Sequence, residues 1–186
     1  MQLCCLPALI FLAFCLYGVV IRTRLEGVMK GFVMLKDLTF DLVLTDLKAQ
    51  TQRKSLREIA GTLAGASGLD PAVLARLFIY KEKRQRSAIG RGVAIVDLQS
   101  IRVVRPLLAL AVLDHSVDFR APDGRGVDLV AALLSPLKDG PVHLQKISGV
   151  SRLLRDDILC ESLRMAKDPD AVRLLLMRPE QRLSAA

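Results

Sequence analysis

Hydrophobic and polar residues recur along this chain with two periods, one typical of helices and one typical of strands. Apolar residues at the helical spacing predict a helix over residues 55–66. Its predicted buried face consists of Leu56, Ile59, Ala60 and Leu63. A second helix is predicted to begin at Pro71, because proline suits the first helical position and Asp70 is a suitable N-cap. The apolar face of this helix consists of Val73, Leu74, Leu77 and Phe78.

Short apolar segments bounded by turn residues predict the strands. These segments are residues 40–47, 93–96, 107–113, 117–119 and 127–134. Residues 107–113 are continuously apolar, which is typical of a strand that is buried on both faces. Pro122, Asp123 and Gly124 form a turn sequence between the last two segments, so a hairpin is expected there.

Three further helices are predicted near the C-terminus, over residues 143–154, over residues 157–166 and from Pro169 onward. Asp168 is the expected N-cap of the last helix. The residues that this helix is expected to direct inward are Val172, Leu175 and Leu176. The predicted order is one strand, two helices, several strands and three helices, which favours a single-domain α/β sandwich with a central sheet.

The start of the chain has a different pattern, because residues 3–21 are uncharged and almost entirely apolar. This length just suffices for a transmembrane helix. Arg22 and Arg24 would then hold its C-terminal side in the cytoplasm. The alternative is that translation begins at Met29 or Met34 and that the segment is not part of the protein. The sequence alone leaves both interpretations open.

The predicted organisation therefore has three parts. Residues 1–28 form the apolar N-terminal segment, residues 34–178 form one globular domain, and residues 179–186 form a loose tail. The expected location is the cytoplasm, with tethering to the inner face of the membrane by residues 3–21 if the protein contains them.

The composition supports a packed core and argues against extensive disorder, because 52% of the residues are hydrophobic and 25% are charged. The four cysteines show no CxxC spacing, so neither a zinc site nor a disulfide framework is expected. Buried apolar side chains are the expected role of the cysteines. The motifs indicate no metal and no cofactor.

The formal net charge of +8 is compatible with nucleic acid, anionic lipid or an acidic protein as a partner. Part of this charge is concentrated in one short basic string, in which Glu82 is the single acid. The cations of the string are Lys81, Lys83, Arg84, Arg86 and Arg91. No aromatic residues are interleaved with them, so nucleic acid is not the expected partner.

Several stretches of the chain resemble the type-2 IIA domain of the bacterial phosphotransferase system, and nearest its nitrogen-regulatory branch. They are SLREIAGTLA with GLDPAVLARL, AIGRGVAI, VDFRAPDGRGVDLVAALLSP and HLQKISGVSRLLRDD. Their order and spacing match this family, which includes the fructose and mannitol IIA domains, from about Met34 to Met177. The resemblance implies an α/β sandwich with a mixed sheet.

The resemblance also implies an activity. Such domains accept a phosphoryl group from the carrier protein HPr onto a histidine. Nitrogen-regulatory members bind target proteins according to their phosphorylation state.

The chain departs from the family at the position of the phosphoacceptor. The family loop usually ends in Ala-Ile-Pro-His, whereas this chain has Ala94-Ile95-Val96-Asp97. By the resemblance, Asp97 takes the position of the phosphoacceptor, and His143 matches the second active-site histidine. Lys81 and Ser87 are the phosphate-binding residues that the resemblance implies, although Lys81 lacks the planar fork of the usual arginine.

The chemistry of a carboxylate argues against phosphate acceptance at Asp97. An ionised carboxylate repels an incoming phosphoryl dianion, and aspartyl phosphates usually need a bound metal and a lysine to offset this charge. Two interpretations of Asp97 remain open: its fixed charge in part mimics a phosphorylated residue, or the substitution is neutral drift. For His143, a phosphate-contacting role and a plain surface or capping role both remain open.

The predicted function is a degenerate regulatory protein of the phosphotransferase system that binds one or more target proteins and forms no phosphohistidine. The alternative is an active phosphocarrier that takes phosphate from HPr on His143 or Asp97. HPr is a disfavoured partner, because the basic string is expected to border the site and HPr is itself positive around its active histidine. The membrane is a partner only if residues 3–21 belong to the protein.

Overall fold

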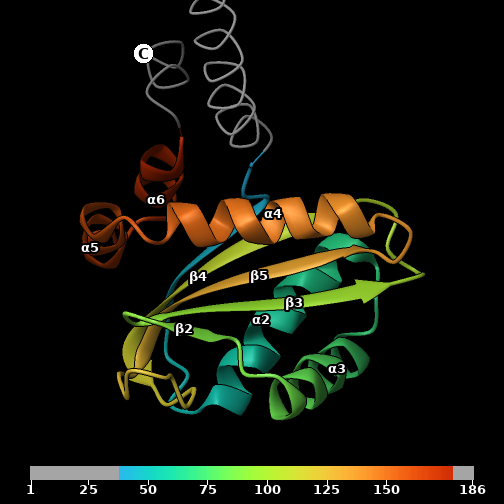
Figure 1. Cartoon of the computed structure of the whole chain (residues 1–186), viewed down its shortest axis with the longest axis horizontal. Helices are drawn as coiled ribbons and strands as arrows, with labels where there is room; N and C mark the ends of the chain where they lie inside the picture. Colours follow the sequence, from blue (N-terminus) through green and yellow to red (C-terminus); the bar gives the residue numbers. More distant parts are fainter. Residues whose placement is uncertain (1–37, 178–186) are drawn as a thin grey trace, which may run out of the picture. The chain divides into compact units, whose positions relative to one another are not determined.

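The protein is described by a computed structural model over residues 38–177, which shows the predicted α/β sandwich (Figure 1). The elements in chain order are β1 (Leu42–Leu47), α2 (Gln52–Ser67), α3 (Pro71–Arg84), β2 (Ala88–Gly90), β3 (Val93–Ser100), β4 (Leu107–Val117), β5 (Val127–Pro136), α4 (Gly140–Leu153), α5 (Asp157–Met165) and α6 (Pro169–Leu176). The predicted order of elements is confirmed.

The expectations for the apolar segment over residues 1–28 and for the tail over residues 179–186 concern parts of the chain outside the described residues. Within residues 38–177, none of the helices combines the length and the apolar character that are needed to cross a bilayer.

The five strands form one mixed sheet in the order β1-β4-β5-β3-β2. β1 is parallel to β4 and β3 is parallel to β5, whereas the β4–β5 and β2–β3 pairs are antiparallel. The short edge strand β2 pairs with β3 only at Val93 and Ala94. Among the described residues, the rest of β3 therefore has a strand neighbour only on the side of β5, and its other side is open to side chains from the helices.

Helices cover both faces of the sheet. α2 and α3 pack on one face and α4 packs on the other, above the sheet in Figure 1. The face toward α2 and α3 holds the main apolar core, which includes Leu56, Ile59, Leu63, Leu74, Phe78, Ala109, Ala111, Val130 and Ala132. All residues from Leu107 to Leu113 are buried, as the continuous apolar run predicts.

Helix caps explain where the first two helices begin. α2 begins at Gln52 rather than at Ser55, because Thr51 Oγ1 accepts a hydrogen bond from the Lys54 N–H at 3.3 Å. Asp70 caps α3 as expected, since its Oδ1 accepts from the Val73 N–H at 2.8 Å. At the start of α6, Asp168 takes the N-cap position, but its side chain makes no capping hydrogen bond.

Several strands differ from the expectations in their presence or extent, and the largest differences concern β2, β3 and β4. The three-residue strand β2 was not predicted, and β3 runs on to Ser100 through Asp97 and Gln99. The predicted strands over residues 107–113 and 117–119 are one continuous strand, β4, up to Val117. The hairpin to β5 is present, and Gly124 adopts the left-handed φ of 70° in its turn.

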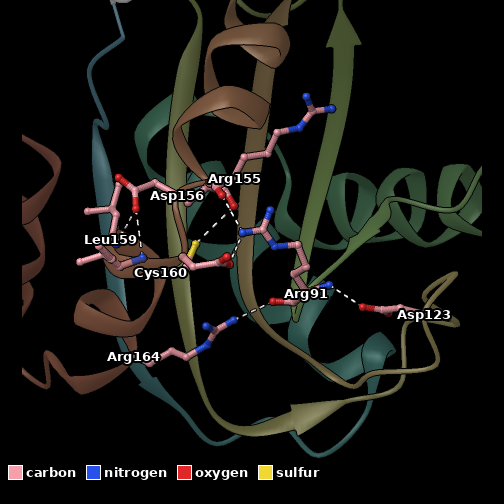
Figure 2. Close-up of polar contacts among 10 residues, drawn as sticks. Arg91, Asp123, Arg155, Asp156, Leu159, Cys160 and Arg164 are labelled. Atoms are coloured by element: carbon pink, nitrogen blue, oxygen red, sulfur yellow. Dashed lines mark hydrogen bonds and ion pairs between the residues drawn. The ribbon is translucent and has the colours of Figure 1, made fainter.

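A group of polar contacts anchors the turn between β2 and β3 (Figure 2). Arg91 has a positive φ of 60°, and its N–H donates to Asp123 Oδ2 at 2.6 Å. Its guanidinium pairs with Asp157 and donates to the Arg155 carbonyl at 2.6 Å. Hydrogen bonding to Arg91 lowers the pKa of both aspartates. The turn is thereby tied to the hairpin and to α5.

The neighbouring Gly92 allows a close approach that any side chain would block. Gly92 has a φ of 79°, and an added Cβ would lie 2.7 Å from Arg164 Nη2 and 2.9 Å from Asp128 Oδ1. These two side chains form an ion pair, with Arg164 Nε 2.9 Å from Asp128 Oδ2. We expect Gly92→Ala to lower the free energy of unfolding by about 1–3 kcal/mol, as measured by urea denaturation.

The matched control for this prediction is Gly61→Ala. Gly61 lies within α2, and an added Cβ would meet nothing within 4 Å. Since alanine is a better helix former than glycine, this variant should be more stable by about 0.5–1 kcal/mol. Equal effects of the two substitutions would contradict the structural explanation.

Candidate functional site

A pocket of about 500 Å³ lies beside the open edge of β3, between α3 and α4. Its polar lining includes Asp97, His143, Lys81 and Ser87, which are the site residues that the sequence suggests. The other lining residues are Phe78, Glu82, Gln85, Arg86, Ile89, Ile95, Val96, Gln99, Leu144, Ile147 and Ser151. The fold thus brings the four suggested residues together from α3, the β2–β3 region and α4.

Asp97 is the centre of the polar contacts in this pocket. Its Oδ2 accepts a hydrogen bond from Lys81 Nζ and lies 2.8 Å from His143 Nε2. The side chain of Asp97 is 20% exposed, so its charge is partly shielded from water. One carboxylate oxygen therefore links β3 to α3 through a cation and to α4 through an imidazole.

His143 continues this chain of contacts into the core. The residue is only 4% exposed, and its Nδ1 is hydrogen-bonded to Ser135 Oγ at the end of β5. Since an ionised carboxylate only accepts hydrogen bonds, His143 Nε2 is the donor to Asp97, and the Ser135 hydroxyl contacts the ring at Nδ1. Both ring nitrogens of His143 are therefore engaged.

The Ser135–His143–Asp97 series has the residue types of a hydrolase triad, but its placement excludes that chemistry. Ser135 is completely buried at the inner end of the series, so its hydroxyl cannot reach a substrate. The carboxylate, rather than the hydroxyl, faces the pocket. We interpret Ser135 as a residue that positions the imidazole.

A second group of contacts surrounds Glu82, which is buried on α3. Glu82 Oε1 accepts from Gln52 Nε2 at 3.0 Å and from the Ser87 N–H at 3.3 Å. Burial raises the pKa of the Glu82 carboxyl, and the hydrogen bonds from the Ser87 backbone and from Gln52 oppose this effect. Ser87 Oγ is buried and has no hydrogen-bond partner among the described residues.

The basic string does not form one continuous border around the pocket, contrary to the expectation from sequence. Only Lys81 and Arg86 of its five cations line the pocket. Arg84 donates to the Tyr80 hydroxyl at 2.8 Å, and its guanidinium lies 5.6 Å from the Tyr80 ring centre. Arg91 is paired with Asp157, the first residue of α5. The α3 helix and the β2–β3 turn direct neighbouring cations to different places.

Sequence reasoning missed the roles of Ser135 and Gln52 in these contacts. Ser135 closes the apolar run LVAALLS, and a lone hydroxyl in a buried strand is a sign that a polar partner lies nearby. Gln52 gave no such sign, because its position on α2 depends on a cap that the apolar pattern does not show.

Comparisons with known proteins agree with this fold. Residues 38–178 match the family described as "Phosphoenolpyruvate-dependent sugar phosphotransferase system, EIIA 2". This chain belongs to that family.

Individual relatives and structures show the same relationship. A nitrogen regulatory protein of Bradyrhizobium diazoefficiens is 32% identical over 139 residues, which are 75% of this chain and 91% of that protein. The crystal structure of the nitrogen regulatory protein IIA-Ntr from Neisseria meningitidis has a TM-score of 0.70 at 25% identity, covering 78% of this chain and 99% of that one. The IIA mannitol structure from Escherichia coli, at 21% identity and a TM-score of 0.60, covers 73% of this chain and 95% of that one and shares the fold.

The raised pKa of Glu82 predicts that the free energy of unfolding depends on pH. Because the folded state binds this proton more tightly than the unfolded chain, its contribution to stability is complete below the ordinary pKa of 4.5. This contribution is lost as the pH rises through the folded-state pKa. Glu82→Gln has no such proton, so the variant should gain stability relative to the wild type between pH 4 and pH 7. Urea unfolding at both pH values measures this.

Glu58→Gln is the control, since Glu58 is an exposed glutamate on α2. It removes the same charge without a change in the core, and its pH-dependent effect should be smaller. A Glu82→Gln stability difference that stays constant from pH 4 to pH 7 would show that burial does not govern the titration of Glu82.

Proposed function

We propose that this EIIA type 2 protein is a regulatory protein that binds one or more target proteins and forms no phosphohistidine. The pairing of Asp97 with Lys81 and His143 carries this proposal. Lys81 Nζ and His143 Nε2 both contact Asp97 Oδ2, and attack of this oxygen on phosphorus would sacrifice these charge-assisted contacts. Similarity to a nitrogen regulatory protein over 91% of that protein's length supports the regulatory class.

The position of His143 argues against a phosphocarrier that uses this histidine. An attacking imidazole needs a free ring nitrogen, and Nδ1 of His143 is hydrogen-bonded to the Ser135 hydroxyl while Nε2 contacts Asp97. The ring is also buried, which leaves no room for an incoming phosphoryl group at Nδ1. Its role here is to hold the Asp97 carboxylate in place.

The same pairing bears on whether Asp97 imitates a phosphorylated residue. Phosphorylation adds nearly two negative charges, whereas Asp97 carries one, which Lys81 offsets. We therefore propose that Asp97 and Lys81 act as an internal pair rather than as a negative signal at the pocket. A protein bound over the pocket would then contact an Asp97–Lys81 pair that has almost no net charge.

The rim of the pocket supports binding to a protein. Ile89 is 42% exposed and Leu144 is 66% exposed, and both line the pocket beside Arg86. Exposed aliphatic side chains next to an arginine are typical of the centre of a protein interface. The proposed target therefore covers the pocket between α3 and α4.

The proposal predicts that the protein takes up no phosphate. We expect incubation of the full chain with phosphoenolpyruvate, enzyme I and HPr to leave its intact mass unchanged, because Asp97 Oδ2 is engaged by Lys81 and His143 and His143 Nδ1 is engaged by Ser135. A relative with the histidine of the family loop serves as the positive control. A mass increase by one phosphoryl group would contradict the proposal. Stability to mild alkali would then identify His143, and lability to alkali would identify Asp97 as the acceptor.

A repair experiment asks whether only the nucleophile is missing. Asp97→His, alone and together with Val96→Pro, restores the residues of the family loop at this position. Because the pocket and its remaining polar residues are in place, we expect at least one of these variants to acquire one acid-labile phosphate from HPr. Intact-mass measurement before and after acid treatment detects it.

The control for the repair is Asp97→Asn, which removes the charge without adding a nucleophile and should stay at its original mass. If both histidine variants also stay unmodified, the contacts with HPr have been lost along with the phosphoacceptor.

A further inference from the structure

A second pocket of about 280 Å³ adjoins the Asp97 pocket, and its lining is strongly basic. Residues from the start of α2, the end of α3 and the segment after β4 line it. Four of them are cations, Arg53, Lys83, Arg86 and Arg120. Figure 1 shows the elements that contribute them on the side of the sheet opposite α4. We call this the basic pocket.

The charges of these four side chains are not offset by the fold. All four residues are exposed, and none of them forms an ion pair within residues 38–177. Glu82 is the single acid among the described residues that line the basic pocket.

The backbone at one side of the basic pocket is also unusual. Arg120 has a φ of 54°, in the left-handed region that arginine rarely adopts. Its N–H donates to Asp118 Oδ1 at 2.6 Å, and this hydrogen bond helps to hold the conformation. A strained residue of this kind is a common feature of ligand-binding sites.

The floor of the basic pocket is apolar, since it includes Leu56, Ile79 and Phe119. Leu56 and Phe119 are fully buried. Charges beside such a floor attract an anion more strongly than charges in open solvent, because the local dielectric constant is lower. The three arginines can each grip phosphate oxygens with two N–H groups.

We propose that the basic pocket binds a small ligand that carries two or more linked phosphate groups. Its volume of about 280 Å³ lies just below the usual range for ligand pockets, which is about 300–1,000 Å³. It therefore suits a diphosphate or triphosphate chain, with any further part of the ligand lying outside. A single orthophosphate has too little charge to engage four cations. The proposal does not depend on the chemistry of Asp97.

Calorimetric titration of the full chain with sodium tripolyphosphate tests this proposal directly. We expect one saturable site for tripolyphosphate and binding that is weaker by about tenfold or more for orthophosphate, a difference of about 1.4 kcal/mol. Both titrations are made at the same ionic strength, because salt screens exposed charges. Lack of saturable binding, or equal binding of the two anions, would overturn the proposal.

Matched pairs of substitutions separate the basic pocket from the general positive charge of the protein. Arg53→Ala with Lys83→Ala removes one pocket cation from α2 and one from α3, and should weaken tripolyphosphate binding by about tenfold or more. Arg57→Ala with Arg76→Ala removes two exposed cations from the same helices outside the pocket and should change affinity by less than about twofold. Equal losses in both double variants would show nonspecific attraction and overturn the proposal.

Titrations with further compounds test whether the bound phosphate chain is part of a nucleotide or of a nucleic acid. ATP that binds as well as tripolyphosphate, or more tightly, supports the proposal and shows whether a nucleoside contributes. Adenosine that binds as tightly as ATP would overturn it. So would a single-stranded oligonucleotide that competes more strongly than tripolyphosphate, because the surface would then bind a nucleic-acid backbone. Unchanged unfolding midpoints of the double variants confirm that they are folded.

Discussion

The candidate site depends on the contacts of the Asp97 carboxylate with Lys81 and His143. β3 lacks a strand neighbour on one side at this point, so the carboxylate joins it to a helix on each face of the sheet. Behind the imidazole, the buried Ser135 hydroxyl fixes the ring. In a partly buried group of this kind each polar atom depends on the others, because an unpaired one is costly to bury. The same contacts that stabilise the site are the ones that, in the proposed function, attack on phosphorus would break.

Much of the fold could be predicted from local patterns, and the errors have physical causes. The Asp70–Pro71 cap and the apolar run over residues 107–113 carry strong local information, and the structure contains both features. β2 has only three residues, and Asp97 and Gln99 interrupt the apolar pattern of β3, so neither extent was visible in the sequence. Polar residues occur there because the edge of β3 faces a pocket rather than the core.

The site itself was visible only in part. The family resemblance placed Asp97, His143, Lys81 and Ser87 near one another, but no pattern in the sequence shows that Asp97 would share one oxygen between Lys81 and His143. The basic string shows most clearly which features of the site could not be predicted from the sequence. Its members are adjacent in sequence, yet α3 and the following turn direct Lys83 and Arg86 toward Arg53 and Arg120, which come from distant segments. In the folded protein, cations that are neighbours in the sequence lie apart, and cations from distant segments of the sequence line the same pocket.

The position of β1 in the sheet also affects the order in which the protein folds. β1 is the first element of the described chain, but its partner is β4, with Leu42 opposite Ala109, a separation of 109 − 42 = 67 residues. During synthesis, β1 therefore leaves the ribosome long before its partner exists, and closure of this long loop is slow. Until then its apolar residues lack their final cover. Chaperones that shield exposed strands would have their main task here, between the emergence of β1 and the completion of β4.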